Sequence, residues 1–418
     1  MNNVNNVGTS FPARLLFHAA ITLLVSRQQQ RRVLEAQQSL TCRPHLSRER
    51  IEVMSQDRIR VGIIGVHPDR GWASAAHIPA LQQLPEFELT AVSHHDPEVA
   101  ASAARKYNVP YALSTAGDLI NHDEIDLVVV AVKVMHHEDL VTSAIEAGKA
   151  VFCEWPLGVS LDQATRMRDL AHARGVATTI GLQARATPPF VYMRDLIRDG
   201  YVGEVLSSTM IGAGVILGES MSQVQKYTLK PENGIGLQHV MFAHSIDALL
   251  HVLESRFVEV NGFFATRRAT IRIEETGDVL PMSVPDQLVV NGTLEGGPVI
   301  AAHFRGGLSQ GTNFHFEING TKGDLILTSP VGYTGIDGFT LRGATGSETL
   351  HELTVPVKYG ADRFVNGPAQ GIASAYVRLA SDLKSGTQLS PTFDDAVELH
   401  RLIDAIERSG GLERHCRD

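Results

Sequence analysis

An apolar strand that runs into a glycine turn constrains the fold of this chain more than any other feature. Residues 58–66 read RIRVGIIGV, and a helix-forming stretch follows over 73–83. A continuous apolar run is typical of a parallel strand that is buried on both faces. Strand and helix patterns then alternate as far as residue 181, so we expect a doubly wound Rossmann domain of the α/β class.

The pattern changes after about residue 183. Helices are expected over 189–199 and 241–253, and two more close the chain over 369–385 and 393–409. Strand-like runs occupy 206–211, 258–266, 286–294, 299–304, 314–319 and 324–327. Consecutive strands joined by glycine-rich turns predict an open, mostly antiparallel sheet. We therefore divide the chain into a leader over 1–56, an NAD(P)-binding Rossmann domain over 57–182 and a substrate and oligomerisation α+β domain over 183–410.

The leader differs from the rest of the chain in charge. Residues 1–53 hold seven Arg and three Glu, a net charge of +4, and removing it from the total of −9 leaves −13 for residues 54–418. The apolar run over 15–25 has 11 residues, whereas a membrane-spanning helix needs about 20. We interpret the leader as disordered or non-native, with an organellar transit peptide as the alternative. The acidic body argues against direct nucleic-acid binding, and we expect no membrane partner.

Three widely separated cysteines offer neither a disulfide framework nor a zinc spacing, which favours a reducing, cytoplasmic location. The adjacent histidine pairs at 94–95 and 136–137 have no third ligand at a suitable spacing. The sequence therefore predicts no metal site.

The turn after the first strand is the first candidate for cofactor binding. Gly65, Gly71 and Trp72 belong to this turn, which is longer than the usual GxGxxG pattern. Glycine permits the tight turn and lets backbone N–H groups approach a pyrophosphate at a helix N-terminus. An ordinary strand–helix turn is the alternative.

The tip of the second strand indicates which cofactor is bound. A ribose-binding Asp or Glu is expected there, but Ser93 and His94 occupy the tip, and Asp96 is placed to cap the following helix. Because Ser93 and His94 can both donate to a 2′-phosphate, the pattern favours NADP over NAD, or little discrimination between them.

Five motifs in order resemble those of the Gfo/Idh/MocA oxidoreductases. They are His77-Ile78-Pro79-Ala80, residues 147–156 (AGKAVFCEWP), the glycine-rich 233–236 with HSID at 244–247, NGTKG at 319–323, and PTFDDA at 391–396. The resemblance implies a Rossmann domain followed by a domain with an open sheet, NAD or NADP as cofactor, and sugar or polyol substrates. It also implies a homodimer formed through the open sheet.

Two departures from the family pattern affect its chemistry. Trp155 stands where the family has a Lys that polarises the reacting oxygen, and Val240 stands where an Asp is expected four residues before His244. The indole N–H of Trp is a donor that does not titrate near neutral pH, so it cannot act as an acid or base. A subgroup that includes the fungal galactose-pathway repressor shares the Glu-Trp pair. That repressor binds a dinucleotide and an activator protein, so the resemblance also implies a possible regulatory protein partner.

The candidate catalytic residue is His244, which can serve as a general acid or base. Tyr227 or Lys226 could assist it, since Tyr–Lys pairs transfer protons in other reductases. The alternatives are that His244 is a buried histidine whose hydrogen bonds are satisfied within the protein, and that Tyr227 and Lys226 are exposed loop residues.

Further candidates lie at the ends of later strands. Lys133, His137, Glu154 and Trp155 are expected to contact the cofactor. Trp155 is also a candidate platform for stacking of a sugar face.

Arg185 and Asp247 are further candidates for substrate binding. Each assignment has an alternative. Lys133 could be a lysine at the edge of the sheet, Trp155 a core aromatic residue, and Arg185 a member of a surface ion pair.

These residues lead to two hypotheses of function. The first is an NAD(P)-dependent oxidoreductase that transfers hydride to or from a sugar-like, polyol or keto substrate. The second is a non-catalytic dinucleotide-binding regulator that acts through protein–protein contacts. A lyase or glycosidase-like reaction through transient oxidation is a third possibility.

Overall fold

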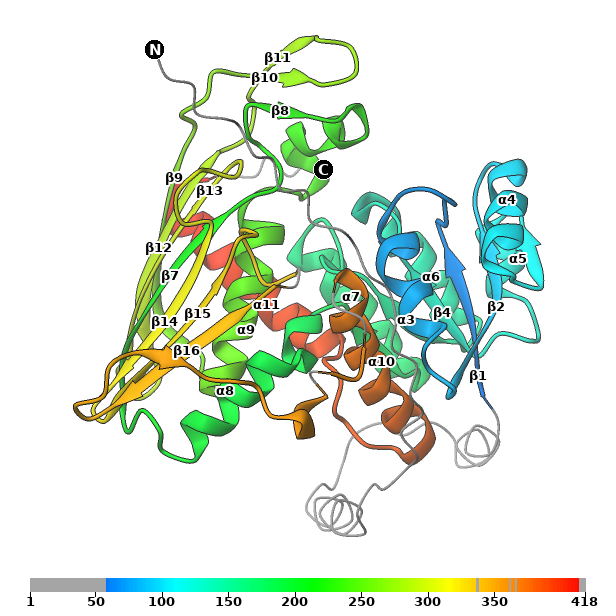
Figure 1. The fold of residues 1–418 in the computed structure, drawn as a ribbon. Coiled ribbons are helices and arrows are strands. Elements are labelled where there is room, and N and C mark those ends of the chain that lie inside the picture. Colours follow the sequence, from blue (N-terminus) through cyan, green and yellow to red (C-terminus); the bar gives the residue numbers. More distant parts are fainter. Residues whose placement is uncertain (1–57, 336–337, 361, 365–366, 413–418) are drawn as a thin grey trace, which may run out of the picture. The chain divides into compact units, whose positions relative to one another are not determined.

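A computed structural model describes residues 58–335, 338–360, 362–364 and 367–412. The predicted leader over 1–56 lies outside the described residues. The first domain contains a six-stranded sheet of order β3-β2-β1-β4-β5-β6, in which every pair of neighbours is parallel. This is the Rossmann order, so the prediction of a doubly wound domain is confirmed (Figure 1).

The elements of this domain follow the predicted alternation. The strands are β1 Ile59–Ile64, β2 Phe87–Ser93, β3 Tyr111–Leu113, β4 Leu127–Val130, β5 Ala150–Cys153 and β6 Thr178–Ile180. The helices are η1 Ala73–His77, α3 Ile78–Leu81, α4 Pro97–Tyr107, α5 Ala116–Ile120, η2 Val134–His136, α6 His137–Glu146 and α7 Leu161–Arg174. The helix expected over 73–83 begins as a π-helix, η1, and continues as α3.

Asp96 caps a helix, as the sequence predicts. Its Oδ1 accepts a hydrogen bond of 3.0 Å from the backbone N–H of Glu98 at the start of α4. An N-terminal carboxylate satisfies an otherwise unpaired backbone donor, so Asp96 is committed to the helix.

The second domain is built on an eight-stranded sheet of order β17-β16-β15-β14-β7-β13-β12-β9. Its strands are β7 Val205–Ala213, β9 Phe257–Ala265, β12 Gln287–Leu294, β13 Val299–Arg305, β14 Phe314–Gly320, β15 Gly323–Ser329, β16 Thr340–Thr345 and β17 His351–Glu352. Neighbours are antiparallel except β7 and β13, which are parallel. The prediction of a mostly antiparallel sheet is confirmed. The sequence did not predict the parallel pairing of β7 with β13, and it did not predict the strands β16 and β17.

A smaller sheet, which the sequence did not predict, lies apart from the large one. It has the order β11-β10-β8, with β8 at Ser220–Met221, β10 at Thr270–Ile273 and β11 at Val279–Pro281. Strands of two to four residues carry too little periodicity to be found in a sequence.

Helices cover one face of the eight-stranded sheet. Figure 1 shows α8 Pro188–Arg198, α9 Ala243–Leu253 and α11 Phe393–Ser409 on that face, while α10 Pro368–Ser385 packs against η1 and α3 of the first domain. Short helices η3 Gln183–Ala186, η4 Gln223–Leu229, η5 Pro231–Asn233, η6 Gln238–Phe242 and η7 Val357–Tyr359 connect the larger elements. Along β13, Ile300, Ala302 and Phe304 are buried under the helices, whereas Val299 on the other face is 54% exposed.

Candidate functional site

The glycine turn after β1 has the backbone that a dinucleotide turn requires. Gly65 has φ +89°, and a Cβ at this position would lie 2.4 Å from Cγ1 of Val132. Gly71 has φ +90°, and among the described residues no heavy atom beyond the glycine and its two neighbours lies within 4 Å of the place where its Cβ would be. Glycine is therefore needed at the first position for close packing, and the second faces open space.

Two buried polar atoms beside this turn have no hydrogen-bond partner among the described residues. They are Oγ of Ser93, at the end of β2, and Nε1 of Trp72. Buried polar atoms are nearly always hydrogen-bonded, so both atoms fit a bound polar group. Together with the glycine turn they fit a dinucleotide at the carboxyl edge of the parallel sheet.

His94 lies in a group of histidines next to Ser93. Its ring centroid is 4.2 Å from that of His95 and 6.2 Å from that of His67. Burial and the neighbouring His95 lower the pKa of His94.

Glu154 follows β5 and joins a chain of buried hydrogen bonds. Its Oε1 lies 2.9 Å from Nε2 of His77, and Nδ1 of His77 lies 2.8 Å from the hydroxyl of Tyr376 in α10. A carboxylate only accepts, so Nε2–H of His77 donates to Glu154 and the Tyr376 hydroxyl donates to Nδ1. A Cβ on Gly181 would lie 2.7 Å from the same Oε1, so that glycine makes room for the carboxylate.

The sequence singled out His77 only as part of a motif, and it missed Tyr376. These two residues are 299 positions apart in the chain. No local pattern marks a contact between residues so far apart.

His137 and Trp155 are both held by other parts of the protein. Nδ1 and Nε2 of His137 lie 2.9 and 3.1 Å from the backbone carbonyls of Pro156 and Val132, and burial lowers the pKa of the ring. Trp155 is 5% exposed, and its Nε1 donates to the backbone carbonyl of His239 over 2.5 Å. The ring of His137 and the indole N–H of Trp155 therefore both contact polar groups inside the protein.

Lys133 and Tyr227 lie together although they are far apart in the sequence. Nζ of Lys133 is 4.6 Å from the centroid of the Tyr227 ring, a distance at which a cation is attracted by the aromatic face. Burial raises the pKa of Tyr227. Lys226, in contrast, is exposed, so the structure joins Tyr227 to Lys133 and not to its neighbour in sequence.

His244 lies beside an aromatic residue that the sequence analysis missed. Its ring centroid is 5.9 Å from that of Tyr333, and its Nδ1 is buried without a partner among the described residues. Burial lowers the pKa of His244 to about 4. Burial, and then the charge of Glu154, raises the pKa of Tyr333 to about 12. Tyr333 belongs to the irregular segment after β15, where no periodic signal exists to find it.

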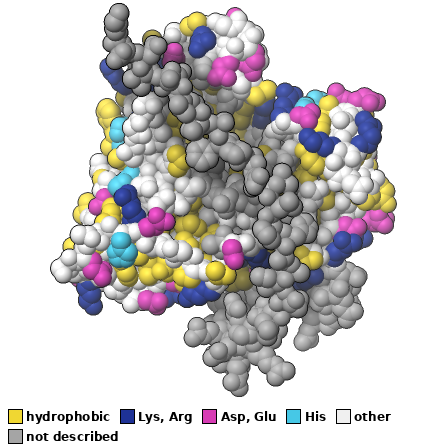
Figure 2. Space-filling view, in the orientation of Figure 1, with side chains coloured by type: hydrophobic (Ala, Val, Ile, Leu, Met, Phe, Trp, Pro, Cys, Tyr) yellow, Lys and Arg dark blue, Asp and Glu magenta, His cyan; other side chains and the backbone are white. Residues whose placement is uncertain are grey.

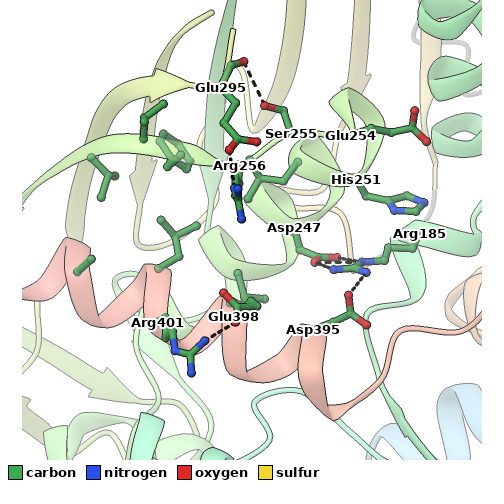
Figure 3. A pocket seen from close by; sticks show the side chains of 17 residues that line it. Arg185, Asp247, His251, Glu254, Ser255, Arg256, Glu295, Asp395, Glu398 and Arg401 are labelled. Carbon is green, nitrogen blue, oxygen red and sulfur yellow. Dashed lines mark hydrogen bonds and ion pairs between the residues drawn. The ribbon is translucent and has the colours of Figure 1, made fainter. Parts of the chain in front are cut away.

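Arg185 and Asp247 form an ion pair with each other. The two side chains make contacts of 2.6 to 3.1 Å, and Nη1 of Arg185 also donates to Oδ1 of Asp395 over 2.8 Å. All three line a cavity of about 700 Å³ between α9, β9 and α11 (Figure 3). Burial raises the pKa of Asp247 in spite of the guanidinium, whereas Arg185 holds the pKa of Asp395 below its usual range against the effect of burial. His244 and Glu154 do not line this cavity.

The described residues contain neither a cluster of metal ligands nor a helix that could span a membrane. No group of three or more His, Cys, Asp or Glu side chains within the described ranges is arranged to hold a metal ion. Within those same ranges, no helix combines the length and the apolar character needed to cross a membrane.

The fold and the site together define a class: a two-domain oxidoreductase fold with a dinucleotide-binding Rossmann domain. Residues 59–182 match the family model for the oxidoreductase family with an NAD-binding Rossmann fold, GFO_IDH_MocA. Residues 188–329 match the model for the C-terminal domain of Gal80p. The chain belongs to the Gfo/Idh/MocA oxidoreductase family and carries a second domain of the Gal80p type.

Both regulators and dehydrogenases are similar to this chain. It is 34% identical over 304 residues to the galactose/lactose metabolism regulatory protein GAL80 of Saccharomyces cerevisiae, covering 68% of this chain and 69% of that protein. It is 26% identical over 377 residues to the dehydrogenase aclE of Aspergillus oryzae, covering 84% and 96%.

Solved structures show the same two similarities. A super-repressor mutant of Gal80p from S. cerevisiae superposes with a TM-score of 0.76 at 29% identity, covering 85% of this chain and 96% of that one. Levoglucosan dehydrogenase in complex with NADH and levoglucosan has a TM-score of 0.73 at 21% identity, covering 85% and 98%. The second likeness concerns the fold alone.

The buried ring of His244 is expected to reduce the stability of the protein at acid pH. Its pKa is about 4 in the folded protein, against 6.5 for an ordinary histidine. The unfolded chain therefore takes up the proton first, so this contribution to the free energy of unfolding is complete above about pH 6.5 and is lost as the pH falls to about 4. The loss amounts to about 3 kcal/mol.

Urea denaturation at stepped pH measures this effect when the protein is compared with the His244→Gln variant. The free energy of unfolding of the unmodified chain should fall more steeply than that of the variant between those two pH values. Equal slopes would contradict the buried, unpaired state of the ring.

Proposed function

We propose that this protein is an NAD(P)-dependent oxidoreductase that transfers hydride to or from a sugar-like, polyol or keto substrate. The observation that carries the proposal is His244, whose buried Nδ1 has no hydrogen-bond partner among the described residues and whose ring lies beside Tyr333. A buried nitrogen without a hydrogen-bond partner lowers the stability of the protein, unless a ligand forms that hydrogen bond. The bound nicotinamide would supply the hydride chemistry, and the chain would supply the proton transfer and the orientation of the substrate.

The residues at the carboxyl edge of the sheet would hold the cofactor. The turn with Gly65 and Gly71 would receive the pyrophosphate, and Ser93 would bind the adenosine ribose or its phosphate. Glu154, which His77 orients, is suited to the ribose next to the nicotinamide.

His244 is suited to act as the base in place of the missing lysine. With a pKa of about 4 the ring is neutral at physiological pH and has a free lone pair. When an alcohol is oxidised, its hydroxyl proton would pass to this nitrogen as the hydride leaves the carbon. Tyr333 stays protonated, because its pKa is about 12, and can donate to the same oxygen. Lys133, whose ammonium lies over the ring of Tyr227, would form with it a second donor pair for the substrate.

Two observations support a sugar or polyol as the substrate. The candidate residues include the imidazole of His244 beside the hydroxyl-bearing Tyr333 and the ammonium of Lys133 beside Tyr227, and such groups bind hydroxyl-rich molecules through hydrogen bonds. The levoglucosan dehydrogenase that shares the fold is described in complex with levoglucosan and NADH.

A specific observation also favours a non-catalytic regulator as a second candidate function. Trp155 replaces the family lysine, and its only polar atom is bonded to the backbone of His239. The regulatory protein GAL80 is similar over both domains of this chain. A regulator would keep dinucleotide binding and act through protein contacts. On the face drawn in Figure 2, basic and acidic side chains are interspersed, which does not suggest a nucleic-acid partner.

The outer face of the large sheet supports a homodimer. Phe263 on β9 and Val299 on β13 are 62% and 54% exposed on the face opposite the helices. Exposed apolar side chains on an uncovered sheet favour association with a second copy.

Replacing His244 tests the catalytic proposal. His244→Ala should reduce turnover of the active member of a sugar and polyol panel at least ~100-fold, because general-base catalysis is lost. The absorbance of the reduced nicotinamide measures the rate. The exposed His351→Ala is the control. Tight cofactor binding without turnover on any substrate would favour the regulator instead.

Replacing His94 tests the choice of cofactor. We expect the protein to bind NADPH more tightly than NADH, since no carboxylate lies at the tip of β2. His94→Asp should shift the ratio of the two dissociation constants toward NADH by about tenfold, because a carboxylate repels the 2′-phosphate. Asn121→Asp adds the same charge before β4, at the opposite edge of the sheet, and should leave the ratio unchanged. An NADH preference in the unmodified protein would contradict the proposal.

Sedimentation velocity tests the homodimer. The unmodified protein should sediment as a dimer, and the double variant Phe263→Asp, Val299→Asp should sediment as a monomer, because buried carboxylates are costly at an interface. A monomeric unmodified protein would contradict the proposed interface.

A further inference from the structure

Trp155 occupies the position of the family lysine, but its side chain is not directed toward an open site. It is 5% exposed, and its indole N–H donates to the backbone carbonyl of His239 in η6 over 2.5 Å. The preceding residue, Glu154, hydrogen-bonds to His77. These two consecutive residues of the first domain therefore make different contacts. Glu154 bonds within the first domain, and Trp155 bonds to the second domain.

The carbonyl that Trp155 contacts lies one turn before His244. Helix η6, over Gln238–Phe242, is a π-helix that runs directly into α9, which begins at Ala243. Hydrogen bonds in a π-helix join residues five positions apart, and in η6 the backbone N–H of Phe242 donates to the carbonyl of Leu237 over 2.9 Å. The indole thus binds the π-turn that leads directly into α9, the helix that carries His244.

Other contacts show that this turn is fixed from several sides. Nε2 of His239 lies 3.1 Å from Oε1 of Glu407 in α11, and Nε2 of Gln238 donates to the same oxygen over 2.8 Å. The ring of Trp155 packs on His400, also in α11, at 4.6 Å between centroids. Trp155 therefore contacts both the π-turn and the helix that supports it.

The segment before η6 also packs closely on the segment that follows Trp155. A Cβ on Gly234 would lie 2.7 Å from the backbone of Val159, four residues after Trp155. Glycine at 234 lets the segment before η6 pack on the backbone that follows Trp155. The contact between the two domains therefore extends on both sides of the indole.

We infer that Trp155 is a positioning residue that fixes His244 relative to the cofactor edge through the hydrogen bond to His239. This inference rests on the proposed role of His244 in the site. A lysine at this position would carry a flexible ammonium group, whereas the rigid indole holds one donor in a set direction. The exchange of Lys for Trp thus replaces a proton donor with a support for the helix that carries the base.

The test compares Trp155→Phe with a matched control. Phenylalanine keeps an aromatic ring against His400 but lacks the N–H donor. Ser208→Ala also removes one buried donor, the hydroxyl that donates to the backbone carbonyl of Glu317 over 2.7 Å. Both variants lose a single hydrogen bond, so a general loss of stability should affect them alike.

The readouts are the titration of His244 by NMR and amide hydrogen exchange over 243–247. In Trp155→Phe the His244 midpoint should move upward by at least half a pH unit, because water reaches a loosened ring, and exchange should rise about fivefold. Ser208→Ala should change neither. An unchanged midpoint and unchanged exchange in Trp155→Phe would overturn the inference.

A second measurement on the intact chain applies if Trp155→Phe does not fold. The exchange rate of the Trp155 indole N–H should follow that of the amides over 243–247 as urea is added. The Trp72→Phe variant assigns the indole signal, since the chain has two tryptophans. Independent exchange of the indole and these amides would overturn the inference. Neither readout needs turnover, so a protein without activity would contradict the proposed reaction and leave this test intact.

Discussion

The chain of buried hydrogen bonds from Tyr376 through His77 to Glu154 is the interaction on which the site depends. It joins α10, η1 and the end of β5, three elements from distant parts of the sequence. Buried polar groups in such a chain strengthen one another, and each is costly to leave unpaired. The carboxylate is therefore held in one orientation at the carboxyl edge of the parallel sheet. Because α10 packs on the first domain, the last part of the chain completes the site that the first part begins.

The sequence was sufficient to predict the fold because the fold rests on local patterns. Apolar runs mark β1 and β4, and Asp96 before Pro97 marks the start of α4, as its hydrogen bond to Glu98 bears out. The antiparallel second sheet follows from consecutive strands without helices. The β8, β10 and β11 strands were missed because each is too short to show a period. The parallel pairing of β7 with β13 was missed because pairing between distant strands leaves no local signal.

The site was predicted less completely, for a related reason. Glu154 and Lys133 follow buried strands, so their place at the carboxyl edge could be inferred. Tyr333 could not, because it lies in an irregular segment that tertiary packing brings to His244. Arg185 and Asp247 were each singled out, but their pairing with one another and with Asp395 depends on three separate elements. A charge beside a motif does not reveal whether its partner is a ligand or another side chain of the protein.

The parallel pairing of β7 with β13 has a consequence for how this protein can vary. Two parallel neighbours require a long connection, and here residues 214–298 include the small sheet, η6, α9, β9 and β12. The helix that bears His244 therefore lies within a connection whose two ends are fixed in the sheet. Added segments beside β10 and β11 can lengthen this connection without shifting the register of β7 and β13. The segments around His244 can thus diverge among relatives while the framework of the second domain stays constant.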